Sequence, residues 1–81
     1  MIIRVKFFAS CRETVGMNMT EIEITDGGDT NMLMDIILQK YPDLTNQMCD
    51  ISLAVNKTYI DEAVKLKDGD EVALLPPISG G

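Results

Sequence analysis

The chain has 81 residues, of which 46% are apolar and 25% charged, and its formal charge is −6 at pH 7. This length limits it to one domain that can bury roughly 60% of its unfolded surface, and the composition is that of a folded globular protein. Because the acidic charge disfavours attraction to nucleic-acid phosphates or to an anionic membrane, neither is expected as a partner, and a basic partner surface is expected instead.

This sequence lacks the residues and motifs on which several classes of function depend. Histidine is absent, and Cys11 and Cys49 lie far apart and in no CxxC pair, so they are expected to be buried thiols rather than metal ligands or a redox centre. No phosphate-binding glycine motif or nucleophile elbow occurs. Residues 1–9 contain Arg4 and Lys6 and lack the apolar core of a secretory signal, and no run approaches the ~20 apolar residues of a membrane span. We therefore expect a cytoplasmic protein with no bound cofactor, no metal and no self-contained catalysis.

The first segments alternate as half-buried strands do. The alternation in residues 2–8 places Phe8 on the same face as the charged side chains. The next eight residues are typical of a helical turn that ends at Gly16. A second alternation follows over residues 21–25, so the two strands are expected to pair. The expected inward positions of both strands are Ile3, Val5, Phe7, Ile22 and Ile24.

One long helix is predicted after the turn at residues 26–29. Asp29 or Thr30 can cap its start, and Pro42 ends it because proline disfavours helix in the residue before it. Its apolar positions recur at helical spacing, and the methionines that widen this side are expected to fill the core. The apolar positions are Leu33, Ile36, Ile37 and Tyr41, widened by Met32, Met34 and Leu38.

Three further short strands are predicted after a loop or helical turn at residues 44–46. Asn56 and Lys57 form a turn between the first two, and residues 67–70 form the turn before the last, which places Leu75 on the solvent side. The inward positions are Ile51, Leu53, Val55, Val72 and Leu74. The element order predicts an α+β roll over residues 1–75, in which one main helix covers a mixed sheet.

Residues 76–81 have no evident place in this core. Pro76 and Pro77 fix φ and remove two amide donors, so the chain is expected to leave the sheet as an extended arm. Gly80 and Gly81 have no side chains and can enter a narrow channel. The reactive group would then be the Gly81 carboxylate, which coupling to AMP would activate for attack by sulfur. A terminal Gly-Gly alone is also compatible with a frayed end.

The wider sequence resembles the small subunit of molybdopterin synthase along its whole length. The similarity is most specific in the final block, Leu74-Leu75-Pro76-Pro77-Ile78-Ser79-Gly80-Gly81, with the turn and strand of residues 68–73 before it. Further matches are Phe7-Phe8-Ala9 with Arg12-Glu13, Lys40-Tyr41-Pro42 and Ala54-Val55-Asn56.

This resemblance implies a ubiquitin-like β-grasp fold and a sulfur carrier. It implies that an E1-like enzyme uses ATP to adenylate Gly81, that the carboxylate becomes a thiocarboxylate, and that it donates sulfur to cyclic pyranopterin monophosphate. The catalytic side chains would belong to the large subunit, and two copies of each subunit would form a heterotetramer. The implied partner-binding residues are Phe8, Tyr59, Leu75, Pro76, Pro77, Ile78, Ser79 and Gly80.

Two other interpretations remain open. Carriers for thiamine synthesis, and ubiquitin-related modifiers that serve tRNA thiolation, also end in Gly-Gly on this fold and use the same activation chemistry. The Pro-Pro-Ile-Ser spacer and the Phe-Phe-Ala start favour molybdopterin synthesis. A plain β-grasp interaction domain would not need its last two residues at all.

Overall fold

A computed structural model describes residues 1–75, apart from the side chains of residues 47–50. Within this part a five-stranded sheet has the strand order β2-β1-β5-β3-β4. β1 and β5 are parallel, and each of the other neighbouring pairs is antiparallel. The strands are β1 (Ile2–Phe7), β2 (Met19–Glu23), β3 (Ser52–Val55), β4 (Thr58–Ile60) and β5 (Glu71–Leu75).

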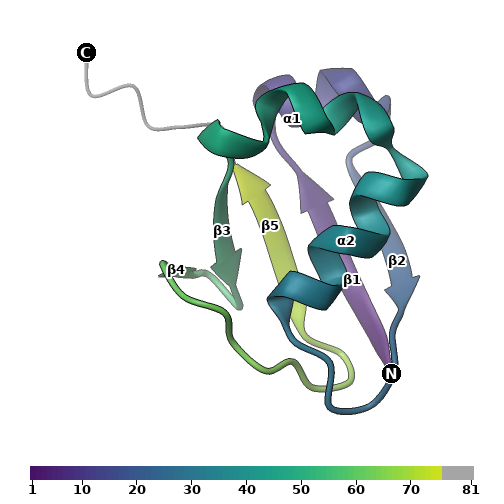
Figure 1. The fold of residues 1–81 in the computed structure, drawn as a ribbon, viewed down its shortest axis with the longest axis vertical. Helices are drawn as coiled ribbons and strands as arrows, with labels where there is room; N and C mark the ends of the chain where they lie inside the picture. The colour runs from purple at the N-terminus through teal and green to yellow at the C-terminus, as the bar shows by residue number, and fades with distance from the viewer. Residues whose placement is uncertain (76–81) are drawn as a thin grey trace.

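The helices lie on one side and at one end of this sheet. α2 (Thr30–Lys40) crosses one face, while α1 (Ala9–Val15) and η1 (Pro42–Asp50) lie at the end where β1 and β5 finish (Figure 1). α1 stops at Gly16, whose φ of 87° is left-handed as the sequence predicts. The predicted α+β roll, with a mixed sheet covered by one main helix, is therefore confirmed.

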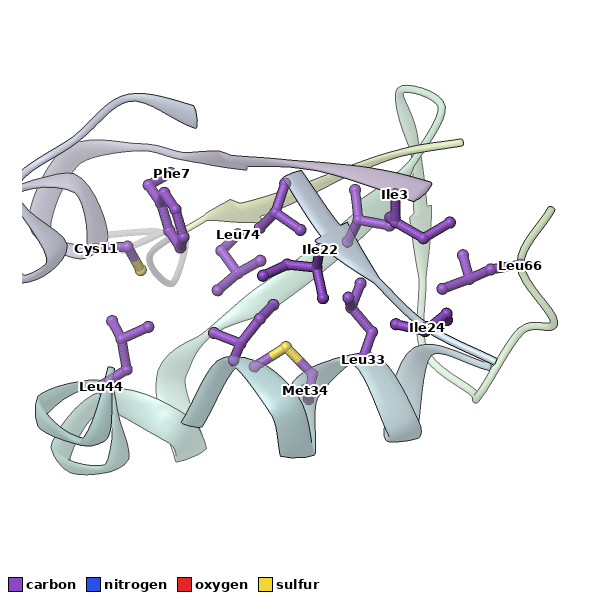
Figure 2. Packing of buried hydrophobic residues seen from close by; sticks show 13 residues of the cluster. Ile3, Phe7, Cys11, Ile22, Ile24, Leu33, Met34, Leu44, Leu66 and Leu74 are labelled. Carbon is purple, nitrogen blue, oxygen red and sulfur yellow. The ribbon is translucent and has the colours of Figure 1, made fainter. Parts of the chain in front are cut away.

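The core fills the space between α2 and the covered face of the sheet (Figure 2). The predicted alternation of β1, β2 and β5 is confirmed, because its inward side chains are buried. Phe7 and Tyr41 close one end of the core with an edge-to-face ring contact at 5.7 Å between centroids. Leu44 and Leu66, which no periodic pattern marked, are also buried.

The apolar side of α2 is narrower than the sequence predicts. Leu33, Met34 and Ile37 are buried, and Leu38 is partly buried against the core. Met32 is 41% exposed, so its assignment to the core was wrong. At 3.6 residues per turn, Met32 lies nearly on the opposite side of the helix from Thr30, which is buried in the same turn, so its side chain points away from the sheet. Met32 is apolar, but its position does not follow the i, i+3, i+4 spacing of the buried side chains.

The start of α2 depends on one side-chain cap. Oδ1 of Asp29 accepts a hydrogen bond from the Met32 amide at 3.0 Å, which satisfies one otherwise unpaired N–H of the first turn. Asp29→Ala is expected to lower the free energy of unfolding by about 1 kcal/mol and Tm by about 4–8 °C. Asp29→Asn keeps an acceptor of the same shape and should unfold near the wild-type midpoint. Equal losses in the two variants, measured by thermal and urea unfolding, would contradict a capping role.

Candidate functional site: the open face of the sheet

The face of the sheet opposite α2 carries one row of side chains in register across all five strands. Lys6 of β1 lies opposite Met19 on one side and Ala73 on the other. Ala73 in turn lies opposite Ala54, and Ala54 lies opposite Tyr59. Alanine thus occupies the middle of the row, and longer side chains stand at both ends.

The two alanines leave a hollow at the centre of this open face. Its volume is about 250 Å³. Ala54 is only 5% exposed although it faces away from the core, because the taller side chains around it screen it from solvent. We call this the alanine hollow, and it is lined by Lys6, Phe8, Ala54, Lys57, Tyr59, Glu71, Ala73 and Leu75.

Phe8, Tyr59 and Leu75, which the sequence placed on solvent faces, come together around the alanine hollow. Phe8 is 39% exposed and keeps an extended backbone as the residue before α1, and its N–H donates to the Leu74 carbonyl at 3.2 Å. Tyr59 is 56% exposed on β4, one of the two edge strands of the described sheet. An apolar group of this kind, ringed by polar side chains, is typical of a protein-binding surface. Their partner-binding role stays a prediction.

The chain leaves the described fold at the edge of the same hollow. Leu75 ends β5, lies opposite Ser52 of β3 and lines the hollow. The predicted residues Pro76, Pro77, Ile78, Ser79, Gly80 and Gly81 follow directly and lie outside the described residues. Six residues span at most about 20 Å when extended. Any centre that acts on Gly81 must therefore lie within about that distance of the alanine hollow.

An ion pair sits on the open face between β1 and β5. Lys6 Nζ and Glu71 Oε1 are 3.1 Å apart, and both side chains are partly exposed. Such a pair contributes little stability. Its effect on the surface is to neutralise the one carboxylate that lines the alanine hollow. Sequence reasoning did not find this pair, because the two residues are distant in the chain and meet only through the parallel pairing of β1 with β5.

Cys11 faces the core from α1 and is buried, as the sequence predicts, whereas Cys49 lies among the undescribed side chains. Burial raises the pKa of the Cys11 thiol above its usual value. A buried, protonated thiol is a poor nucleophile, so Cys11 is unsuited to relay sulfur.

The raised pKa of Cys11 has a consequence at alkaline pH. The unfolded chain releases this proton near pH 8.5, whereas the folded protein retains it to higher pH. The free energy of unfolding is therefore expected to fall as pH rises above about 8.5, since the unfolded state then binds fewer protons. Urea unfolding between pH 7 and 10 would measure this slope. Cys11→Ala should give a shallower decline, and an unchanged slope in that variant would contradict the assignment.

Two further features bear on the type of site. Among residues 1–75, outside the side chains of residues 47–50, no group of three or more Cys, Asp or Glu side chains is arranged to hold a metal ion. In the same part of the chain, no helix has the length and apolar character needed to cross a membrane.

The fold and the open face define this chain as a ubiquitin-like β-grasp protein with a surface suited to binding another protein. The chain belongs to the ThiS family, whose model matches residues 5–81. This match and the similar proteins described next confirm both the β-grasp fold and the resemblance to sulfur-carrier subunits that the sequence predicted.

Similar proteins extend over the full chain. The molybdopterin synthase sulfur carrier subunit of Chlamydomonas reinhardtii is 42% identical in an alignment 83 residues long that covers 100% of each chain. A putative molybdopterin converting factor subunit 1 from Pyrococcus furiosus has a TM-score of 0.87 at 29% identity, covering 96% of this chain and 99% of its own. A third match is one chain of a protein–protein complex between subunits 1 and 2 of the molybdopterin-converting factor from Helicobacter pylori. Its TM-score is 0.73 at 30% identity, and the match covers 100% of both chains.

Proposed function

We propose that this chain is the sulfur-carrier subunit of a molybdopterin synthase, and that its Gly81 carboxylate carries the sulfur. The observation that carries the proposal is the position of Leu75, where the terminal segment begins at the edge of an exposed hollow suited to a protein partner. Membership of the ThiS family and similarity to sulfur carrier subunits over the whole chain support it. The chain would work in the cytoplasm.

The chemistry begins with activation of a carboxylate, which is otherwise a poor acyl donor. An E1-like enzyme would join Gly81 to AMP from ATP and release pyrophosphate. A persulfide would then attack the acyl carbon and displace AMP, and a thiol of the activating system would cleave the S–S bond, becoming a disulfide itself and leaving a Gly81 thiocarboxylate. ATP is consumed by the activating enzyme, and this chain would hold no cofactor.

The second partner would be the large subunit of the synthase. The thiocarboxylate sulfur would attack a carbon of cyclic pyranopterin monophosphate and form a C–S bond as a C–O bond at that carbon breaks, with the oxygen as the leaving group. Water would then cleave the acyl–sulfur bond, which leaves the sulfur on the pterin and restores the Gly81 carboxylate. The carrier would contribute only its terminal acyl group, so the catalytic side chains would come from the large subunit. The Helicobacter pylori relative, solved as a complex of subunits 1 and 2, supports such an arrangement, and a heterotetramer is part of the proposal.

Intact-mass spectrometry tests the activation step. The chain would be incubated with ATP, an E1-like activating enzyme and a persulfide source, and replacement of one terminal oxygen by sulfur is expected. Omission of ATP should leave the mass unchanged. A chain that gains no sulfur when the same enzyme sulfurates a known carrier would refute the proposal.

Reconstitution distinguishes molybdopterin synthesis from the related sulfur pathways. The thiocarboxylated chain, a synthase large subunit and cyclic pyranopterin monophosphate are expected to yield molybdopterin. Thiamine synthesis and tRNA thiolation would be assayed with the same thiocarboxylated sample. Sulfur transfer only in one of those assays would assign the chain to that pathway and refute a role in molybdopterin synthesis.

A further inference from the structure

A second hollow adjoins the alanine hollow on the open face. The two share Lys6 and Phe8, so the exposed ring of Phe8 forms a ridge between them. We call it the arginine hollow, and it is lined by Lys6, Phe7, Phe8, Arg12, Asn18 and Met19. The row from Met19 to Tyr59 crosses four strand spacings, so the joined surface is about 19 Å wide.

The charge of this joined surface is opposite to that of the whole chain. Of 7 basic and 13 acidic residues, the two hollows together are lined by three basic side chains and by the single carboxylate of Glu71. Lys6 pairs with Glu71, so Arg12 and Lys57 leave the surface with a net positive charge. Three other hollows of the described fold have acidic side chains and no lysine or arginine in their linings: Asp61 and Glu62 in the first, Glu23 and Asp26 in the second, and Asp35 in the third. The second is also lined by Met1, whose N-terminal ammonium pairs with Asp26.

Arg12 and Lys57 are the two cations available to a partner here. The ion pairs among the described residues are those of Met1 with Asp26 and of Lys6 with Glu71, so within that part of the chain neither cation is paired. Arg12 is exposed in the last turn of α1, and Lys57 is exposed in the turn between β3 and β4. They stand at opposite sides of the apolar surface.

The backbone at Lys57 adds an independent observation. Asn56 and Lys57 have φ of 50° and 72°, the left-handed pair of a two-residue hairpin turn. Glycine is preferred at the second position, because a side chain there is strained. A lysine held in this conformation is less stable than glycine would be, and such strain is concentrated at functional sites.

We propose that the partner segment that docks on the open face has an apolar centre with a carboxylate on each side, one meeting Arg12 and the other meeting Lys57. The identity of that partner rests on the proposed function, whereas the chemistry of the segment rests on the two hollows. The acidic segment proposed for this face is opposite in charge to the basic partner surface expected from the net charge of the chain. A docked segment lies within a few ångströms of these side chains, whereas charges beyond about 8 Å are largely screened at physiological salt.

Association kinetics with the synthase large subunit give the first test. Arg12→Gln and Lys57→Gln are each expected to slow association about three- to tenfold at low ionic strength, with the difference shrinking as salt is added. Lys40→Gln removes the same charge from the end of α2, away from the open face, and is the matched control. Since the two sites lie far apart, the double variant should show the product of the single effects. Rates no slower than those of Lys40→Gln would overturn the proposal.

Lys57→Gly separates binding from stability. This variant relieves the left-handed strain, so it is expected to raise Tm by a few degrees while slowing association as much as Lys57→Gln does. A purely structural role for Lys57 cannot give effects of opposite direction. Unchanged association in a stabilised Lys57→Gly protein would exclude Lys57 from the docking surface and overturn the proposal.

A peptide titration makes the inference independent of the proposed function. The probe is a synthetic peptide of about seven residues, long enough when extended to span the surface, with glutamate at both ends and threonine, valine and leucine between them. In NMR titrations with the full chain, it is expected to shift the amides of Phe8, Ala54 and Ala73. A peptide with lysine at both ends, and a uridine oligonucleotide, are the comparison probes.

The outcomes of the two experiments are distinguishable. Binding of the acidic peptide by a chain that does not bind the large subunit would support the inference and count against the proposed function. Binding of the large subunit at a rate that substitution of Arg12 or Lys57 does not change would support the proposed function and overturn the inference. Equal binding of the lysine peptide, tighter binding of the oligonucleotide, or self-association through this face would each overturn the inference.

Discussion

Deletion of Gly81, or addition of one residue after it, is expected to lower molybdopterin formation at least about 100-fold. Either change moves the terminal carboxylate by about 3.5 Å along the chain, and misplacement of a reacting group by 1 Å can already cost about that factor. Binding of the large subunit should stay within about tenfold, because the alanine hollow is unchanged and hot-spot residues carry most binding energy. Single-turnover formation of molybdopterin and calorimetric titration measure the two effects.

Gly81→Ala is the matched control for this experiment, since it keeps the length of the chain and adds one methyl group. It should retain more activity than the deletion. If the deletion variant still transfers sulfur at the wild-type rate, the reacting group is not the terminal carboxylate. If instead both binding and transfer fall together in every variant, the terminal segment serves mainly for docking.

The fold was predictable where one residue's environment follows from its immediate neighbours. Alternation located the buried side chains of β1 and β5, proline and aspartate marked the two ends of α2, and glycine marked the end of α1. Each of these signals acts within a few residues and expresses backbone conformation directly. Leu44 and Leu66 gave no such signal, because each is a single apolar side chain from an irregular or 3₁₀ segment that closes the core.

The site was predictable only in part, for a related reason. Sequence placed Phe8, Tyr59 and Leu75 on solvent faces, and the structure brings all three to one hollow. The hollow itself depends on Ala54 and Ala73 lying opposite each other, and alternation treats both simply as outward positions. Register between β3 and β5 is a long-range property that a single sequence does not display. The positive charge of the open face was hidden in the same way by a net charge of −6.

Ala73→Tyr is expected to weaken binding of the large subunit about 100-fold, or about 2.7 kcal/mol. The phenol ring would stand in the alanine hollow between Lys6 and Ala54, where a partner side chain is expected to enter. Loss of a central, well-packed contact costs more than loss of one at the edge of an interface. The fold should tolerate the change, because position 73 faces away from the core and tyrosine favours strands.

Ala63→Tyr adds the same ring to an exposed loop position that lines a different hollow, and it should bind as the wild type does. Calorimetric titration gives both affinities, and thermal unfolding shows whether each variant is folded. A folded Ala73→Tyr protein with wild-type affinity would mean that no partner group enters the hollow. In that case Phe8, Tyr59 and Leu75 would have to act from the edges of the surface, and the 100-fold loss should appear in their alanine variants instead. The depth of the alanine hollow, rather than the exposed apolar area around it, is therefore the property that this substitution tests.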